Sequence, residues 1–147
     1  MKRGFTVILT AAVAGVVATA GAATPANRSG DLRVTKDCPD YHGAAGEFCT
    51  IATSNIPAIK RGMRVYYASA ADFGAGILDS DLMLDGPGNN NAFGHVVLDT
   101  GTFTGVVTFS GGTGRFSHFH TGPLAVACPA FPACSWDGSY AFSPPGD

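Results

Sequence analysis

Short runs of alternating apolar and polar residues, separated by Gly, Pro, Asn or Asp, recur along the chain from Glu47 onward. Runs of about four to eight such residues, rich in β-branched and aromatic side chains, are typical of β-strands. They predict eight strands, at 47–53, 63–68, 77–84, 95–100, 105–110, 115–121, 124–128 and 135–142. Glycine and proline recur too often after residue 23 for an apolar helical period to propagate, so we expect an all-β domain.

The connections between these runs are short, which decides between the two common all-β architectures. Eight antiparallel strands form either a two-sheet sandwich or a closed barrel. The even, meander-like turn spacing of the second half favours an up-and-down order. We therefore predict an eight-stranded antiparallel β-barrel over 47–147. The polar stretch from Thr24 to about Thr35 indicates an irregular linker, and 23–46 is interpreted as this linker followed by a disulfide loop.

The N-terminal residues form a pattern of a different kind. Lys2 and Arg3 precede an uncharged run over 5–20, and Ala20-Gly21-Ala22 fits a small-residue cleavage site. This is typical of a secretory signal peptide over 1–22. An uncleaved membrane anchor is the alternative, but the run is rich in Ala, Gly and Thr, which favours cleavage. The sequence thus predicts a secreted or periplasmic protein.

Charge narrows the classes of partner. The chain of 147 residues is only 14% charged and has a net charge of −2 at pH 7. Loss of Lys2 and Arg3 with the signal peptide leaves seven basic and 11 acidic residues. An acidic domain lacks the basic surface that phosphate backbones require, so we exclude nucleic acid. We also expect no membrane association after cleavage, whereas the sequence leaves homo-oligomerisation open.

Four cysteines, Cys38, Cys49, Cys128 and Cys134, all lie beyond the predicted signal peptide. An even number in an exported chain predicts two disulfides. Of the three pairings we favour the two local ones, Cys38–Cys49 and Cys128–Cys134. A zinc site is the alternative, but neither pair has C-x-x-C spacing.

Three segments carry a resemblance to known families. They are GHVVLD at 94–99, VTFSGGTGRF at 107–116 and WDGSYAF at 136–142, with the acidic DSDL upstream at 79–82. They resemble bacterial secreted members of the dirigent and allene oxide cyclase-like families, and the G-G-T-G-(K/R)-F element is the most specific part. The resemblance implies a calycin-like eight-stranded barrel with an internal ligand cavity.

The same resemblance implies two kinds of function. Dirigent proteins orient phenoxy radicals during coupling, and allene oxide cyclases hold an unsaturated fatty-acid epoxide while it closes to a cyclopentenone. Both act mainly by confining and orienting a molecule. Beyond the glycine element and the acidic strand, the catalytic residues of the plant proteins cannot be matched to positions in this chain. The activity therefore does not carry over, and whether the protein is an enzyme stays open.

Strand parity groups the candidate site residues, because alternate residues of a strand face the same side. Asp79 and Asp81 share one face, His95 and Asp99 another, and His118 and His120 a third together with Phe116. The aromatic face of the last run is expected to point inward. If the polar faces also point inward they line a ligand cavity, and if they point outward they are solvated. The ligand-binding candidates are Tyr67, Asp79, Asp81, His95, Asp99, His118, His120, Trp136 and Tyr140.

Metal binding and acid–base catalysis are weaker interpretations of these residues. His118 and His120 could chelate one ion, but the glutamate that completes a cupin-like set does not follow them. We therefore predict no metal and no other cofactor. Asp79 and Asp81 have the spacing of a carboxylate pair for acid–base work, although an exposed acidic strand has the same pattern.

Three hypotheses about function follow. The first is a barrel that binds a small apolar or aromatic ligand, the second is a cofactor-independent isomerase or cyclase using Asp or His in the cavity, and the third is a structural or interaction protein of the cell envelope. An eight-stranded barrel is either just filled by side chains or able to hold one ligand. Both small-molecule hypotheses, as derived from these residues, require a pocket lined by His95, His118 or Asp81.

Overall fold

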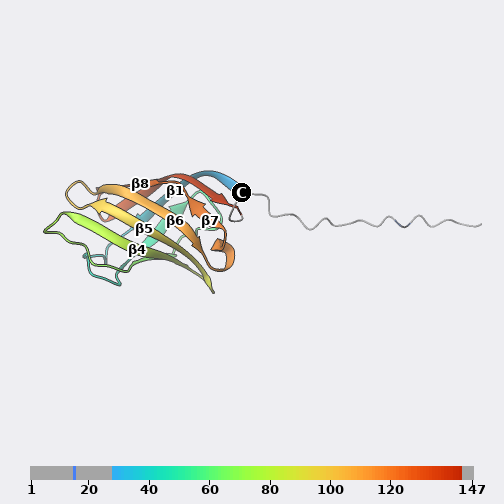
Figure 1. Cartoon of the computed structure of the whole chain (residues 1–147), viewed down its shortest axis with the longest axis horizontal. Helices are drawn as coiled ribbons and strands as arrows, with labels where there is room; N and C mark the ends of the chain where they lie inside the picture. The colour runs from blue at the N-terminus through green and yellow to red at the C-terminus, as the bar shows by residue number, and fades with distance from the viewer. Residues whose placement is uncertain (1–14, 16–27, 144–147) are drawn as a thin grey trace, which may run out of the picture.

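A computed structural model describes residue 15 and residues 28–143, and 28–143 form one antiparallel β-sheet closed into a barrel (Figure 1). The predicted signal peptide, 1–22, lies outside the described residues apart from Gly15. The strands are β1 (Arg28–Asp37), β2 (Phe48–Ser54), β3 (Arg64–Tyr67), β4 (Ile77–Gly86), β5 (Asn90–Asp99), β6 (Thr104–Gly112), β7 (Phe119–Thr121), β8 (Leu124–Ala130) and β9 (Ala133–Phe142). A single 3-10 turn, η1 (Gly114–Phe116), precedes β7.

Nine strands make a barrel of eight positions because β7 and β8 share one place between β6 and β9. The first half of β9 pairs with β8, and its last residues pair with β7. Strand β6 likewise pairs with β8 along its first half and with β7 near its end. The break falls at Gly122-Pro123, where proline has no N–H to donate to a ladder. The barrel closes where β1 pairs with β9 over all ten residues of each strand.

The predicted fold class is confirmed, but two of its elements are wrong. The stretch expected to be an irregular linker forms β1 from Arg28 onward, which pairs with both β2 and β9. The run predicted at 115–121 is only a strand from Phe119, since η1 occupies 114–116. The predicted number of strands equals the eight positions of the barrel only because two errors cancel. Strand β1 was missed, and the runs that form β7 and β8, which share one position, were counted separately.

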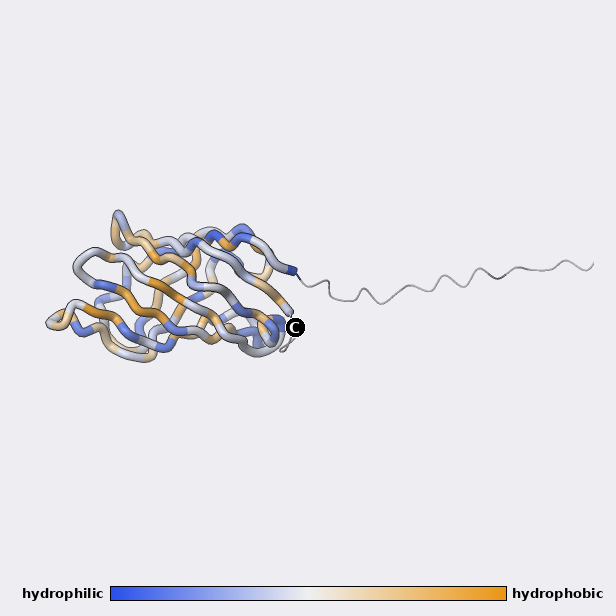
Figure 2. The backbone as a smooth tube through the Cα atoms, turned by 45° about the horizontal axis from the view of Figure 1, so that its top comes forward, coloured by the Kyte–Doolittle hydropathy of each residue, from blue (hydrophilic) through white to orange (hydrophobic). Residues whose placement is uncertain are grey.

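Inward and outward positions alternate along the strands, as Figure 2 shows in the changing hydropathy of the chain. In β1 the inward residues are Leu32, Val34 and Lys36, all at most 5% exposed. In β4 the inward face is Leu78, Ser80, Leu82 and Leu84, so its aspartates point outward. Burial of the apolar face drives this choice, because an unpaired carboxylate in the interior would cost several kcal/mol.

One end of the barrel is filled by aromatic side chains. Phe109 lies 5.6 Å from Phe119 and 5.3 Å from Trp136, measured between ring centroids. Phe116 lies 5.4 Å from Phe119, and Phe119 lies 4.9 Å from Phe142. We call Phe109, Phe116, Phe119, Trp136 and Phe142 the aromatic plug. It lies at the end where the chain enters β1 and leaves β9, since Arg28 pairs with Phe142.

The glycine-rich segment 111–116 has a structural role in this plug. Gly114 adopts a positive φ of 56°, and a Cβ there would lie 2.1 Å from Oδ1 of Asn90. That oxygen accepts a hydrogen bond from the N–H of Arg115 at 2.9 Å. The turn is thereby held against the β4–β5 loop and delivers Phe116 into the interior, where it is 0% exposed.

Both predicted disulfides are confirmed, and both lie at the opposite end of the barrel. Cys38 is bonded to Cys49 across the loop between β1 and β2, and Cys128 is bonded to Cys134 across the turn between β8 and β9. Within 28–143 there is no helix long and apolar enough to cross a membrane.

Candidate functional site

The disulfide end of the barrel encloses a cavity of about 220 Å³. It lies where β1, β3, β5 and β8 end, between the two disulfides and the loops that join these strands. An apolar cavity of roughly 150 Å³ is large enough for benzene, so this one has room for a single substituted ring. Its walls are Lys36, Cys38, Tyr41, His42, Cys49, Tyr67, Ala71, Phe73, Leu78, Val96, Leu98, Thr100, Phe103, Val126, Cys128, Phe131 and Cys134.

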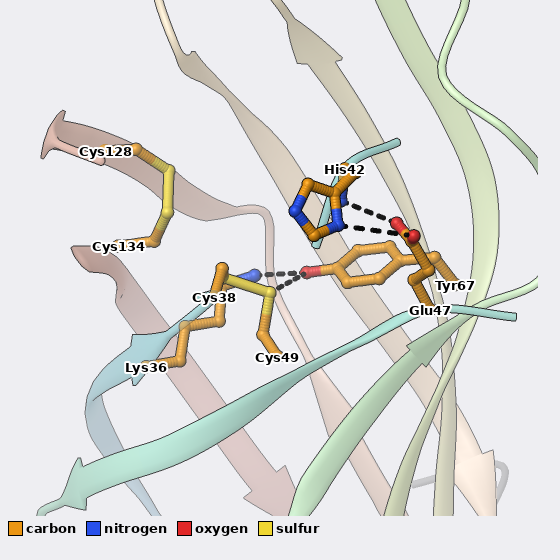
Figure 3. Close-up of a disulfide and its surroundings, with 8 residues drawn as sticks. All are labelled: Lys36, Cys38, His42, Glu47, Cys49, Tyr67, Cys128 and Cys134. Carbon is orange, nitrogen blue, oxygen red and sulfur yellow. Dashed lines mark hydrogen bonds and ion pairs between the residues drawn. A yellow bond between two sulfur atoms is a disulfide. The ribbon is translucent and has the colours of Figure 1, made fainter. Parts of the chain in front are cut away.

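Lys36 is the one cationic side chain in these walls, and it is 5% exposed. Its Nζ donates a hydrogen bond to the hydroxyl of Tyr67, on the inner side of the barrel (Figure 3). The amine also lies 5.1 Å from the centre of the Tyr67 ring and 5.0 Å from that of Trp136. Among the described residues no carboxylate forms an ion pair with it. Burial without a counter-charge lowers the pKa of Lys36 from 10.5 to about 7.

Tyr67 supplies the other polar atom of the same wall. Its hydroxyl accepts the hydrogen bond from Lys36 and lies 3.6 Å from Sγ of Cys49, as Figure 3 shows. Burial raises the pKa of Tyr67, so its hydroxyl keeps its proton at neutral pH. Tyr41 packs on this ring at 4.9 Å, and its own hydroxyl is buried with no hydrogen-bond partner among the described residues. Burial, followed by the nearby Tyr67 and Glu47, raises the pKa of Tyr41 to about 12.

The loop between β1 and β2 closes part of the cavity and is held in place by Glu47. Its carboxylate accepts hydrogen bonds from the backbone N–H groups of His42 at 2.6 Å and Ala44 at 3.0 Å. These bonds lower the pKa of Glu47. The His42 ring lies 3.6 Å from the same carboxylate and is 76% exposed at the mouth of the cavity. The disulfide and Glu47 together fix a loop that has no regular secondary structure.

Three of the candidate residues are inside the barrel, in three different environments. Tyr67 lines the cavity, as described. Trp136 is 1% exposed and lies between the cavity amine and Phe109 of the aromatic plug. Tyr140 packs against Phe142 at 5.9 Å, at the plugged end. The inward orientation expected for the last run is therefore confirmed, but only Tyr67 contributes to a cavity.

Asp79, Asp81 and His95 come together on the outer wall of the barrel. Nε2 of His95 lies 2.7 Å from Asp79 and Nδ1 lies 2.8 Å from Asp81, with the three side chains 50 to 83% exposed. The hydrogen bond to Asp81 is the main cause of a raised pKa of His95. In the described part of the chain no group of three or more His, Cys, Asp or Glu residues has the arrangement of a metal site.

The remaining candidates are also outside the barrel. Asp99 accepts hydrogen bonds from the N–H groups of Gly101 and Thr102 in the β5–β6 turn, with that of Thr102 the main cause of its lowered pKa. His118 and His120 are exposed, whereas Phe116, the last residue of η1, is buried. None of His95, His118 and Asp81 lines the cavity, so both small-molecule hypotheses fail in the form derived from the sequence, and a ligand site has to be argued from other residues.

Lys36 is the functional candidate that sequence reasoning missed. It lies in the segment interpreted as a linker, where Leu32, Val34 and Lys36 alternate with exposed residues. A cation at the third inward position hides the apolar alternation. The usable signal was the pair Leu32 and Val34, whose spacing already indicates a strand.

Comparison of the chain with protein-family models, with curated proteins and with solved structures finds no match. The fold and the cavity therefore define the class on their own. It is a closed antiparallel β-barrel, filled at one end by an aromatic plug and hollow at the other, where two disulfides and a buried lysine surround the cavity.

Proposed function

We propose that this protein is an exported carrier that binds one small, mainly apolar ligand, containing a single aromatic ring or a short aliphatic chain, in the cavity at the disulfide end. The observation that carries the proposal is an apolar cavity of about 220 Å³ with a buried amine in its wall. Ligand sites are typically apolar pockets with a few polar groups that fix orientation, and here Lys36 and Tyr67 are those groups.

Export fits this function and the disulfides support it. Oxidising compartments keep such bonds intact, and both bonds frame the cavity. A signal peptide over 1–22 and a secreted or periplasmic location are part of the proposal, as is kinship with the dirigent and allene oxide cyclase-like barrels.

The cavity favours a ligand-binding role over the cyclase and structural hypotheses. A cyclase using Asp or His in the cavity would have only His42, because no other described Asp or His lines it. A purely structural barrel would be filled by side chains at both ends, as the aromatic plug fills one. The cavity leaves room that no packing role requires.

Native mass spectrometry of the protein purified from its own host, with the disulfides intact, tests the proposal. We expect a molecule of one-ring size that is released on denaturation. Leu98→Phe, which projects a ring into the cavity, should abolish this co-purification, whereas Val97→Phe on the outer face of the same strand should leave it unchanged. A wild-type protein that carries nothing and binds neither benzyl alcohol nor benzaldehyde would overturn the proposal.

A further inference from the structure

The wall of the cavity places a primary amine beside a hydroxyl in an apolar space. Lys36 projects from β1 and Tyr67 from β3, the two strands that flank β2, and their side chains meet at their polar ends (Figure 3). Of the three lysines in the sequence, Lys36 is the one that lines this cavity, and Lys60 is exposed between β2 and β3. A buried amine with no carboxylate beside it is available for chemistry that a salt-bridged lysine is not.

We propose that Lys36 binds an aldehyde or ketone ligand covalently, as an imine between its Nζ and the carbonyl carbon, with Tyr67 handling the protons. This inference rests on the proposed ligand-binding function and names the chemical class of its ligand. It requires no oxidant, reductant or cofactor, because imine formation releases only water.

The step balances with the groups present. The lone pair of the neutral Lys36 amine attacks the carbonyl carbon while Tyr67 donates its proton to the carbonyl oxygen, giving a carbinolamine. The phenolate of Tyr67 takes one proton from the nitrogen and returns it to the carbinolamine oxygen, so water leaves as the C=N bond forms and a protonated imine remains. The phenolate then takes the second proton from this nitrogen, which gives the neutral imine and restores the Tyr67 hydroxyl, and the reaction runs backwards when water enters.

The surroundings of Lys36 favour this reaction at neutral pH. Only a neutral amine is a nucleophile, and burial brings the pKa of this amine to about 7. The titratable groups around it are Tyr67, Tyr41 and, at the mouth, His42, and none of these is an acid that would hold the amine as an ammonium ion. The apolar walls limit the water that would hydrolyse the imine.

A carbonyl fits this wall better than a carboxylate does. A carboxylate has two charged oxygens that need several donors, whereas the cavity wall offers the Lys36 amine and the Tyr67 hydroxyl. A neutral imine leaves no buried charge, and its nitrogen needs only the one donor that the Tyr67 hydroxyl supplies. A carboxylate ligand, paired with Lys36 as an ion, is the competing outcome.

The test uses the exported protein with benzaldehyde as probe and sodium cyanoborohydride to reduce any imine. We expect one benzyl group per chain at pH 7, mapped by peptide mass spectrometry to Lys36. Lys36→Met and Lys36→Arg should abolish labelling in the β1 peptide, and Lys60→Met should leave it unchanged. Tyr67→Phe should slow labelling by roughly 100-fold while benzyl alcohol still binds.

Probe binding measured without the reductant distinguishes a failure of the imine proposal from a failure of the ligand-binding function on which it rests. Trp136 is the only tryptophan, and its ring lies 5.0 Å from Nζ of Lys36, so its fluorescence reports occupancy. If benzyl alcohol or benzoate changes the fluorescence but benzaldehyde leaves no benzyl group on Lys36, the imine proposal fails and the carrier survives. If no probe binds, both fail.

Discussion

The two ends of this barrel are built from the same strands with the same alternation, yet one end is solid and the other hollow. At the plugged end five large aromatic side chains interlock. At the disulfide end the inward positions of β8, β9 and the start of β2 are Cys128, Cys134 and Cys49, whose side chains are much smaller than the rings of the plug. Two covalent bonds hold that end together where side-chain packing does not, and this leaves space for a ligand.

This difference between the two ends explains why a buried lysine is tolerated at the disulfide end only. Its amine lies next to a cavity and a hydroxyl, whereas at the plugged end the same group would have to displace an aromatic ring. The plug thus holds the large packed rings, and the hollow end holds the buried amine.

The plug should carry the largest share of stability. Phe109 is 1% exposed and contacts both Phe119 and Trp136, so Phe109→Ala should lower the free energy of unfolding by about 3–5 kcal/mol. Phe131→Ala, at the rim of the cavity where the side chain is 44% exposed, should lower it by less than about 1 kcal/mol. Urea unfolding under oxidising conditions measures both changes in the free energy of unfolding. Equal losses for the two variants would contradict the larger share assigned to the plug.

The Cys38–Cys49 bond should be the main stabilising element of the hollow end. Replacing both cysteines by alanine opens a loop with a sequence separation of 11 residues. Chain entropy predicts a loss of about 2–3 kcal/mol in the free energy of unfolding. Faster hydrogen exchange should follow in the 38–49 loop, with the plug residues unchanged. Exchange that rises equally at both ends would show that the bond stabilises the whole barrel and not its hollow end.

Lys36 should lower the free energy of unfolding, whereas the residues of the plug should raise it. Lys36→Met should raise the free energy of unfolding by about 1–4 kcal/mol at pH 7, since it removes a buried amine without a counter-charge. The pKa of Lys36 falls from 10.5 in the unfolded chain to about 7 in the fold, so between these values the unfolded chain holds one more proton. Wild-type stability should therefore rise with pH from 7 to 9, by at most about 1.4 kcal/mol per pH unit.

The same pH series with Lys36→Met is the control for that slope. The variant should show no rise between pH 7 and 9, because the group that titrates is gone. A slope that persists in the variant would assign it to another group, and a wild-type protein with no slope would place the amine in contact with water.

The outer cluster of Asp79, Asp81 and His95 should have the smallest effect. A raised pKa of His95 contributes stability that is complete below about pH 6.5 and is lost as the pH rises through the folded-state pKa. Because these side chains are at least half exposed, His95→Ala should change the free energy of unfolding by less than about 0.5 kcal/mol at pH 6. Benzyl alcohol should bind this variant as it binds the wild-type protein, and weaker binding would place the ligand site on the outer wall.

The sequence predicted the barrel well because strand runs and turn residues are local signals. It also indicated the local disulfides, since each closes a short segment. The strand β1 was missed because its first four residues are polar or glycine, and its pairing with β9 is a contact between the two ends of the described chain. Closure of a barrel depends on such long-range pairing, which no local pattern shows.

The site was predicted less well, for a reason that the residues make plain. On β4 the choice of face was open to physical argument, because Leu78, Leu82 and Leu84 oppose the two aspartates and the apolar face is the one that is buried. The cavity itself was not predictable in this way. It results from small residues at the inward positions of strands that are distant in sequence, and volume is a property of their sum.

The central claim is that the hollow end, beside Lys36, is a ligand site. A crystal structure of the exported protein soaked with 4-bromobenzyl alcohol tests it most directly, because the anomalous signal of bromine locates the ring without forming an imine. The account predicts a bromine peak inside the barrel between Tyr41, Phe103 and the two disulfides, and no such peak in Leu98→Phe. An empty cavity, or bromine only on the outer wall near Asp79 and His95, would contradict it.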